Sequence, residues 1–194
     1  MARRREYDEN AVLTGAMHAF RRQGFASLSV RDLEAATGLK AGSLYNSFGD
    51  KAGLFRAAFA HYNSTVLGQR IDRYAKAEAG LAGLRIFFLS LLHEPRNEAF
   101  GCLITNSAIE FGPDTPPCVG EGLDSLLALF TARLATAREA GHLRPGLDEE
   151  MGAQRLLALY QGILVLVRAG RDKAALARMI DGDFDVLEEK HHDR

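Results

Sequence analysis

The sequence predicts an all-α protein of about nine helices, with a small N-terminal head and a larger helical body. Apolar residues recur at three- and four-residue spacing along most of the chain, and no sustained period-two run of β-branched residues is present. Hydrophobic residues make up 47% of the 194 residues and charged residues 25%, which is typical of a globular chain with a buried core.

The first helix is expected over Asp8–Gln23. Residues at helical spacing form one apolar stripe along it, and Gly24 closes the helix. The members of the stripe are Val12, Leu13, Ala16, Met17 and Phe20. Phe25 then returns the chain to the core.

Two short helices joined by a glycine-containing turn are expected next. Ser29 and Asp32 have the spacing of a capping box, which starts a helix over Val30–Thr37. Gly38 supplies the left-handed residue that ends this helix, and a third helix follows over about Ala41–Asn46. Such a pair of helices is the helix-turn-helix pattern.

A long fourth helix is expected to begin at Lys51, with Asp50 as its N-cap, and to run to about Ala77, where Gly80 ends or kinks it. Further helices follow between breaks rich in Gly and Pro. They are Leu81–His93, Gly101–Phe111, Val119–Gly141, Asp148–Ala169 and Asp172–Glu189, before a frayed tail, Lys190–Arg194. We therefore expect a head over residues 1–50 and a body over residues 51–194.

The charge is distributed unevenly between the two ends of the chain. Residues 1–56 hold nine Lys or Arg and six Asp or Glu, a charge of +3, so the other residues must carry −4 to give the net charge of −1. A basic head suits a nucleic-acid partner.

The composition also bounds the location of the protein. Two cysteines without C-x-x-C spacing do not make a disulfide scaffold or a zinc site. The N-terminus has no apolar stretch behind its charges, and the longest apolar runs are shorter than the ~20 residues of a membrane helix. A cytoplasmic protein with no membrane partner is expected.

The segment Gly24–Lys51, GFASLSVRDLEAATGLKAGSLYNSFGDK, closely resembles the DNA-binding signature of the tetracycline-repressor-like (TetR) family. Its most specific part is the pattern G-S-L-Y-x-x-F-G-x-K over Gly42–Lys51. The remaining residues resemble the family in size, helix count and loop placement. The resemblance implies a repressor that binds double-stranded DNA at a palindromic operator as a dimer and is released by a small-molecule inducer.

The third helix would then be the recognition helix in the major groove. Small residues at its entry let the backbone approach bases and phosphates: Ala41, Gly42 and Ser43. Leu44 and Phe48 would anchor it in the core. Tyr45 and Asn46 would project outward toward phosphates or base edges.

Cationic and hydroxyl side chains around this helix complete the expected interface. Lys51 adds a charge at the N-terminus of the fourth helix, where a phosphate is favoured. Family analogy implies that Ser29 and Arg31 touch phosphates. The family often has Lys or Arg directly before the Gly of the recognition helix, whereas here Ala41 stands there and Lys40 precedes it, so Lys40 serves phosphate contact. Arg3–Arg5 would form a DNA-binding arm or, alternatively, a solvated end.

The body implied by the resemblance holds a ligand cavity and a dimer interface. Aromatic and aliphatic residues could line the cavity with Cys102 and two polar groups, although they would equally suit plain core: Phe87, Phe88, Leu91, Cys102, Thr105, Asn106, Ile109, Leu126, Phe130 and Tyr160. The dimer would use apolar faces of the last two long helices: Leu156, Leu159, Tyr160, Ile163, Leu164, Val167, Leu176, Met179, Ile180 and Leu187.

Two alternatives stay open. Cys102, at the start of a helix, could sense electrophiles or oxidants, or could be a small buried hydrophobe. Cys118 lies in a Pro-rich loop.

The rival class of protein is an all-α enzyme or a scaffold with a vestigial helix-turn-helix. No catalytic grouping, phosphate loop or paired Glu-x-x-His motif is present, and His61, His93 and His142 are scattered, so neither catalysis nor a metal or cofactor is expected.

Overall fold

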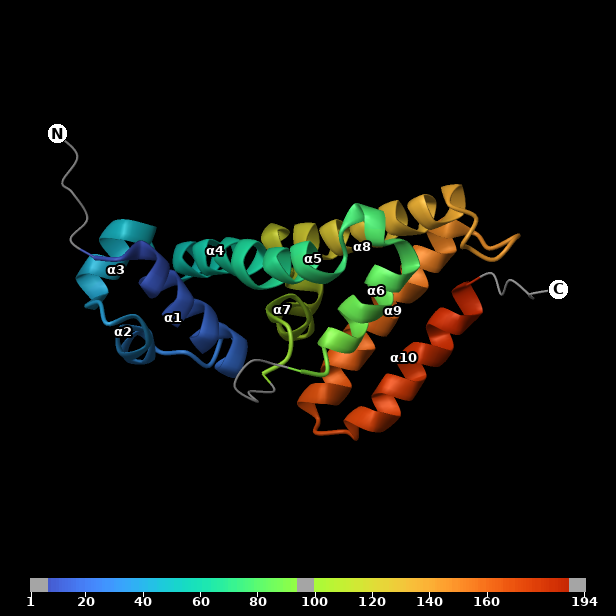
Figure 1. Cartoon of the computed structure of the whole chain (residues 1–194). Helices are drawn as coiled ribbons and strands as arrows, with labels where there is room; N and C mark the ends of the chain where they lie inside the picture. Colours follow the sequence, from blue (N-terminus) through green and yellow to red (C-terminus); the bar gives the residue numbers. More distant parts are fainter. Residues whose placement is uncertain (1–6, 94–99, 189–194) are drawn as a thin grey trace. The chain divides into compact units, whose positions relative to one another are not determined.

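The computed structural model describes residues 7–93 and 100–188, and these residues form helices and no β-strand (Figure 1). The helices are α1 Glu9–Gln23, α2 Val30–Thr37, α3 Ala41–Phe48, α4 Lys51–Tyr62, α5 Gln69–Tyr74, α6 Gly80–Ser90, α7 Leu103–Phe111, α8 Pro117–Glu139, α9 Glu149–Arg168 and α10 Lys173–Leu187. The predicted all-α class is confirmed. Expectations for Arg3–Arg5 and for the tail fall outside the described residues.

The chain forms two compact units. Unit 1 consists of residues Met1–Gly68 and Cys102–Gly120, and unit 2 of Gln69–Gly101 and Glu121–Arg194. The expected boundary at residue 50 differs from this division for two reasons. α4 packs along α1, and α7 also packs against α1, so both belong to the unit that contains the helix-turn-helix.

Side-chain caps start the helices at or near the predicted positions. Asp8, Ser29, Asp50, Asp148 and Asp172 each accept a hydrogen bond from backbone amides in the first turn of the helix that follows. These amides have no partner inside their own helix, so an acceptor at the N-cap lowers the free energy of starting there.

The long fourth helix differs most from expectation. It was expected to continue to about Ala77, but α4 passes into a π-helical turn, Asn63–Gly68, before α5, which ends at Tyr74. A short 3₁₀ turn then leads to Gly80, whose φ of +51° favours glycine and which begins α6 instead of ending the preceding helix. α3 also runs two residues further than predicted, to Phe48.

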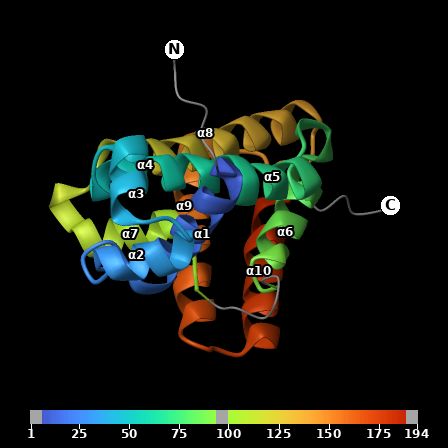
Figure 2. The same cartoon turned by 90° about the vertical axis from the view of Figure 1, so that its left-hand side faces the viewer.

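Aromatic rings form much of the core of unit 1. The Phe20 ring meets the Phe55 ring edge to face at 5.2 Å between centroids, and Phe25 meets Phe55 at 5.4 Å. Phe111 of α7 lies 5.3 Å from Phe25 and 5.7 Å from Phe55. Figure 2 shows α1, α2 and α3 grouped together, with the contacts of α1 and α3 extending to α4. Such rings bury large areas and favour these edge-on geometries.

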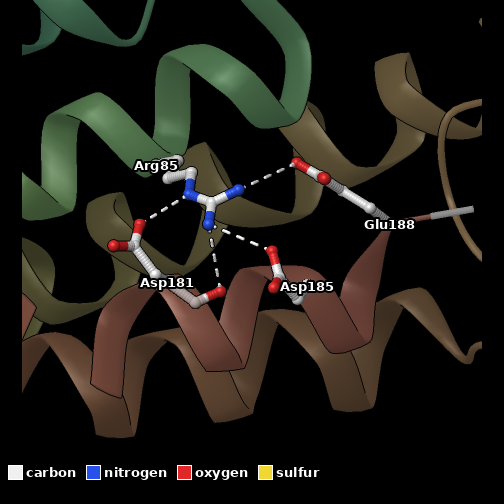
Figure 3. A network of polar contacts seen from close by, with 4 residues as sticks. All are labelled: Arg85, Asp181, Asp185 and Glu188. Atoms are coloured by element: carbon white, nitrogen blue, oxygen red, sulfur yellow. Dashed lines mark hydrogen bonds and ion pairs between the residues drawn. The ribbon is translucent and has the colours of Figure 1, made fainter. Parts of the chain in front are cut away.

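Unit 2 has its own aromatic core and a polar network on one side of it. The guanidinium of Arg85 on α6 donates to Asp181 from Nε at 2.7 Å and to Asp185 from Nη2 at 3.0 Å, both on α10 (Figure 3). Glu188 lies 3.9 Å from Nη1. The hydrogen bond to Asp181 is the main cause that raises the pKa of Arg85. The network ties α6 to α10.

Candidate nucleic-acid interface

α2 begins at a complete capping box. The Asp32 amide donates to Ser29 Oγ at 3.2 Å, while the Ser29 amide and hydroxyl both donate to Asp32 Oδ2, at 2.9 and 2.6 Å. These bonds, the Ser29 hydroxyl first, lower the pKa of Asp32. Both donors of Ser29 bond Asp32 inside the head, so Ser29 fixes the start of α2. The prediction of a phosphate contact by Ser29 stays a prediction.

α1 and α2 cross with their backbones almost in contact. A Cβ on Gly15 would stand 2.0 Å from the Ala36 carbonyl oxygen, which no side chain tolerates. Leu33 of α2 is completely buried. The direction of α2 on α1 is thus set by a glycine and by close packing.

The N-terminus of α3 is capped by a side chain from α2. Lys40 stands at the N-cap without a side-chain cap bond, and Glu34 Oε1 instead accepts the Ala41 amide at 2.8 Å. The Lys40 ammonium lies 3.9 Å from Glu34 Oε2, and its side chain is 89% exposed. Lys40 is therefore available to a phosphate, and Glu34 is a structural residue that sequence reasoning missed.

The outer face of α3 is polar and uncommitted. Leu44 points inward and is 1% exposed, whereas Gly42, Ser43 and Asn46 are exposed and Tyr45 is half-buried. Within residues 7–93 and 100–188, the side chains of Ser43, Tyr45 and Asn46 form no hydrogen bond. Their donors and acceptors are free for an external partner, as are those of the exposed Arg31 on α2.

Gly42 has no structural reason to be glycine among the residues that the structure describes. None of them lies within 4 Å of a Cβ built on it, and its φ is not in the left-handed region. Glycine in a helix costs about 0.5–1 kcal/mol relative to Ala. The bare backbone at this position thus suits close approach by a molecule outside the chain.

Lys51 has an internal role that the sequence did not indicate. Its ammonium donates to the Leu28 carbonyl at 2.5 Å and lies 4.7 Å from the centroid of the Phe25 ring. It therefore ties the start of α4 to the loop between α1 and α2. The prediction of a phosphate contact by Lys51 stays a prediction.

Tyr7 is a further residue that sequence reasoning missed. Its hydroxyl donates to Ser47 Oγ at 2.7 Å, which ties the chain before α1 to α3. No signal in the sequence joins two residues 40 positions apart.

A packed three-helix head that exposes the polar face of its third helix defines a helix-turn-helix DNA-binding protein.

The predicted ligand-binding residues of unit 2 form a closed aromatic cluster. Phe87 stacks on Tyr160 at 5.8 Å, Phe88 lies 5.5 Å from Phe130, and Phe88 lies 5.3 Å from Phe184. Leu91 and Leu126 are buried as well. These residues are core in the structure, and their role in binding a ligand stays a prediction.

The predicted ligand-binding residues of unit 1 lie on or beside α7. Thr105 is buried, and Asn106 is used to donate from Nδ2 to the Arg21 carbonyl at 3.0 Å. Ile109 is 69% exposed, so the expectation that it lines a cavity is not met. Cys102 is 1% exposed and its Sγ accepts a hydrogen bond from the Tyr62 hydroxyl at 3.1 Å.

The apolar faces predicted for the dimer interface are wrong for most of their members. The chain's own core buries eight of the ten residues: Leu156, Tyr160, Ile163, Leu164, Val167, Leu176, Ile180 and Leu187. Leu159 is half-buried and Met179 is exposed. The cause is general, because a helix first satisfies its apolar stripe within its own chain, and the sequence does not mark which side a partner covers.

No cluster of three or more His, Cys, Asp or Glu with metal-binding geometry occurs among the described residues. Neither Cys102 nor Cys118 forms a disulfide with another described residue. Over the same ranges, no helix has the length and apolar character needed to cross a membrane.

Comparison with known families agrees with this class. Residues 12–58 match the family of bacterial regulatory proteins, tetR family, and residues 80–182 match the tetracyclin repressor-like C-terminal domain. The matches cover more than half of the chain, and the chain belongs to the tetR family. It is a DNA-binding transcriptional regulator.

Individual relatives span nearly the whole chain. The HTH-type transcriptional repressor ComR of Escherichia coli (strain K12) is 30% identical over 179 residues, which cover 84% of this chain and 81% of ComR. The HTH-type transcriptional repressor Rv1474c of Mycobacterium tuberculosis (strain ATCC 25618 / H37Rv) is 28% identical over 184 residues, covering 93% and 90%.

Solved structures show the same fold. The TetR family regulator CifR, complexed with a 26-base-pair double-strand operator DNA, has a TM-score of 0.83 at 24% identity and covers 94% of this chain and 98% of CifR. The reduced form of E. coli NemR has a TM-score of 0.80 at 17% identity and covers 93% and 97%.

Proposed function

We propose that this chain is a repressor that binds a palindromic operator as a homodimer and releases it when a small molecule binds the body. The observation that carries the DNA-binding part is the outer face of α3, where Ser43, Tyr45 and Asn46 have unused polar groups and Gly42 leaves the backbone bare. The side chains would read base edges and phosphates in the major groove, and Arg31 and Lys40 would neutralise phosphates beside it.

A matched pair of stripes on α9 and α10 supports the homodimer. On α9, Met151, Ala158 and Val165 are exposed at seven-residue intervals, and the Gly162 Cβ position is open. On α10, an exposed face carries residues at alternating intervals of four and three, which also add up to seven: Ala175, Met179, Gly182 and Val186. Small residues at this spacing let helices pack at the shallow angle of a four-helix bundle.

A second copy is the partner that fits these stripes. Each stripe belongs to a helix whose opposite face is already buried in unit 2, and a two-fold axis would bring the same stripes of two copies together. A dimer with two heads explains why the operator would be a palindrome.

The inducer is proposed from the composition of the core of unit 2. Phe87, Phe88, Phe130 and Tyr160 contact one another, so a ligand would have to enter among the rings and separate them. Such a site favours an apolar or aromatic compound. A ligand that binds the released state more tightly lowers operator occupancy by mass action.

The alternative of a thiol sensor at Cys102 is not favoured. Its side chain is buried, and Tyr62 donates to the sulfur. Oxidants and electrophiles react with accessible thiolates, and burial keeps them away from this sulfur.

The experiment is a titration against a labelled duplex of the DNA that flanks the protein's own gene, at two salt concentrations, with unrelated DNA of equal length as control. The proposal expects tight, salt-sensitive binding to the flanking duplex, weaker on the unrelated DNA, and loss of the difference in Asn46→Ala. Equal, weak binding to both duplexes, at either salt concentration, would contradict specific operator binding in the flanking DNA.

A further inference from the structure

A carboxylate of α7 holds the loop between α1 and α2. Glu110 Oε2 accepts the Phe25 amide at 2.7 Å, and Oε1 accepts the Ala26 amide at 2.7 Å. The residues joined are 85 and 84 positions apart. Hydrogen bonds to a carboxylate are stronger than neutral ones. Glu110 is exposed, and its cap restrains the loop because two oxygens of one carboxylate hold two successive amides.

Other contacts of α7 converge on the same loop. Asn106 Nδ2 donates to the Arg21 carbonyl in the last turn of α1 at 3.0 Å. The Phe111 ring lies 5.3 Å from the Phe25 ring. α7 therefore binds the end of α1 and the loop through a side-chain amide, a carboxylate and an aromatic ring.

Gly24 is adapted to the position of this carboxylate. Its φ of +84° favours glycine, and a Cβ at this residue would stand 2.7 Å from Glu110 Oε2. The bare residue turns the chain so that the next two amides point at Glu110 and leaves room for its carboxylate.

The restrained loop leads directly into the DNA-binding helices. It runs from Gly24 to Ser29, the N-cap of α2, and Lys51 holds its other end at the Leu28 carbonyl. α2 in turn caps α3 through Glu34. A shift of the loop would move α2 and, with it, the outer face of α3.

We infer that Glu110 is a positioning residue for operator binding: its carboxylate holds the α1–α2 loop, and thereby the recognition helix, in the orientation that binds DNA. The inference rests on the proposed function. The inference gives the segment Cys102–Gly120 a role in DNA binding. This segment lies within the match to the C-terminal family domain, but it belongs to the same compact unit as the helix-turn-helix. Supporting groups of this kind commonly hold a site within the narrow geometry that binding needs.

The first test is amide hydrogen exchange in the full-length protein. In Glu110→Gln, one carboxylate oxygen becomes an NH₂ group that cannot accept, so at least one of the Phe25 and Ala26 amides loses its acceptor. We expect faster exchange at those two amides, with exchange in α8 and α9 unchanged. Unchanged exchange at both amides would overturn the inference.

The second test is DNA affinity with a matched control. The duplex is recovered by the wild-type protein from a randomised library, and Asp114→Asn is the control because Asp114 is exposed and forms no hydrogen bond or ion pair with other described residues. Both variants remove one negative charge, which by itself favours DNA binding slightly. We expect Glu110→Gln to bind about tenfold more weakly than wild type or worse, and Asp114→Asn to bind as well or better.

A third variant separates positioning from general loss of stability. Arg85→Gln removes ion pairs in unit 2 and is expected to lower the thermal midpoint without changing operator affinity. Equal affinities of Glu110→Gln and Asp114→Asn, or an equal loss in Arg85→Gln, would overturn the positioning role. A wild-type protein that selects no duplex would contradict the proposed function itself, and the positioning role would fall with it, whatever the exchange result.

Discussion

The Tyr7 hydroxyl donates a 2.7 Å hydrogen bond to Ser47 Oγ, which joins the chain before α1 to α3. Tyr7→Phe removes the hydroxyl alone. We expect the free energy of unfolding to fall by about 0.5–1.5 kcal/mol, because the bond is partly buried and neutral. Urea denaturation of Tyr7→Phe, Ser47→Ala and the double variant measures the coupling; a double variant that loses the full sum of the two single effects would show that the bond contributes nothing.

Gly15 of α1 and Gly42 of α3 differ in what an added methyl group would meet. Gly15→Ala places a methyl group 2.0 Å from the Ala36 carbonyl, so α1 and α2 must separate and stability should fall by about 1–3 kcal/mol or more. Gly42→Ala meets open space and should leave the fold equally stable or up to about 1 kcal/mol more stable.

The role of Gly42 should appear in DNA affinity and not in stability. Gly42→Ala keeps its fold but should lose about tenfold or more in affinity for specific DNA, because the methyl group intrudes between backbone and DNA. Thermal unfolding and fluorescence anisotropy on the same samples make the comparison. Normal DNA affinity in a folded Gly42→Ala protein would remove this face of α3 from the interface.

The capping box gives the head a defined acid sensitivity. The pKa of Asp32 is lower in the folded protein than its ordinary value of 3.8, so the box contributes stability above that value and loses it as the pH falls through the folded pKa. Asp32→Asn should therefore lower the thermal midpoint at neutral pH and make progressively less difference well below pH 3.8. Asp114→Asn is the control for removal of one exposed charge, and a difference for Asp32→Asn that persists in strong acid would contradict the mechanism.

The Arg85 network should contribute modestly and in a salt-dependent way. The side chains of Asp181 and Asp185 are 44% and 48% exposed, so solvent screens both pairs. Arg85→Gln should lower the free energy of unfolding by about 1 kcal/mol at low ionic strength and by less at high ionic strength. Urea unfolding at two salt concentrations checks this, and a large loss that ignores salt would point to packing by the arginine stem.

A charged residue in the proposed dimer stripe should separate the subunits. Gly182 is exposed, and no described residue lies within 4 Å of its Cβ position. Gly182→Glu should therefore fold as a monomer, lose helix packing to a partner and bind a palindromic duplex far more weakly. Gly120→Glu, at a helical glycine that is equally open, is the control. Sedimentation that shows a dimer for Gly182→Glu would place the interface elsewhere.

Local signals in the sequence predicted most of the helix boundaries. Ser29 and Asp32 started α2 where the capping box indicated, and Gly38, with a φ of +71°, ended it. The exposed polar side chains of α3 could also be predicted. Leu44 is an apolar residue that turns toward the core, so the polar residues on the other sides of the helix turn toward solvent. These features depend on neighbours a few residues apart, which the sequence displays directly.

Long-range relationships could not be predicted in this way. Glu110 caps amides 84 and 85 positions earlier, and Lys51 reaches back to Leu28, without a pattern that pairs these residues. The π-helical turn at Asn63–Gly68 lies inside one continuous helical periodicity, which does not distinguish it from α-helix. The prediction of the dimer faces was wrong because an apolar stripe on a helix indicates that the stripe is buried. It does not indicate whether the helix's own chain or a partner covers it.

The most direct measurement is selection of duplexes by the purified protein from a randomised DNA library, followed by sequencing and footprinting. The account predicts a palindromic sequence whose half-sites lie about one helical turn or a multiple of it apart, protected by the wild type and not by Asn46→Ala. Recovery of no preferred sequence, or of one bound equally well by Asn46→Ala, would contradict the claim that the outer face of α3 reads DNA.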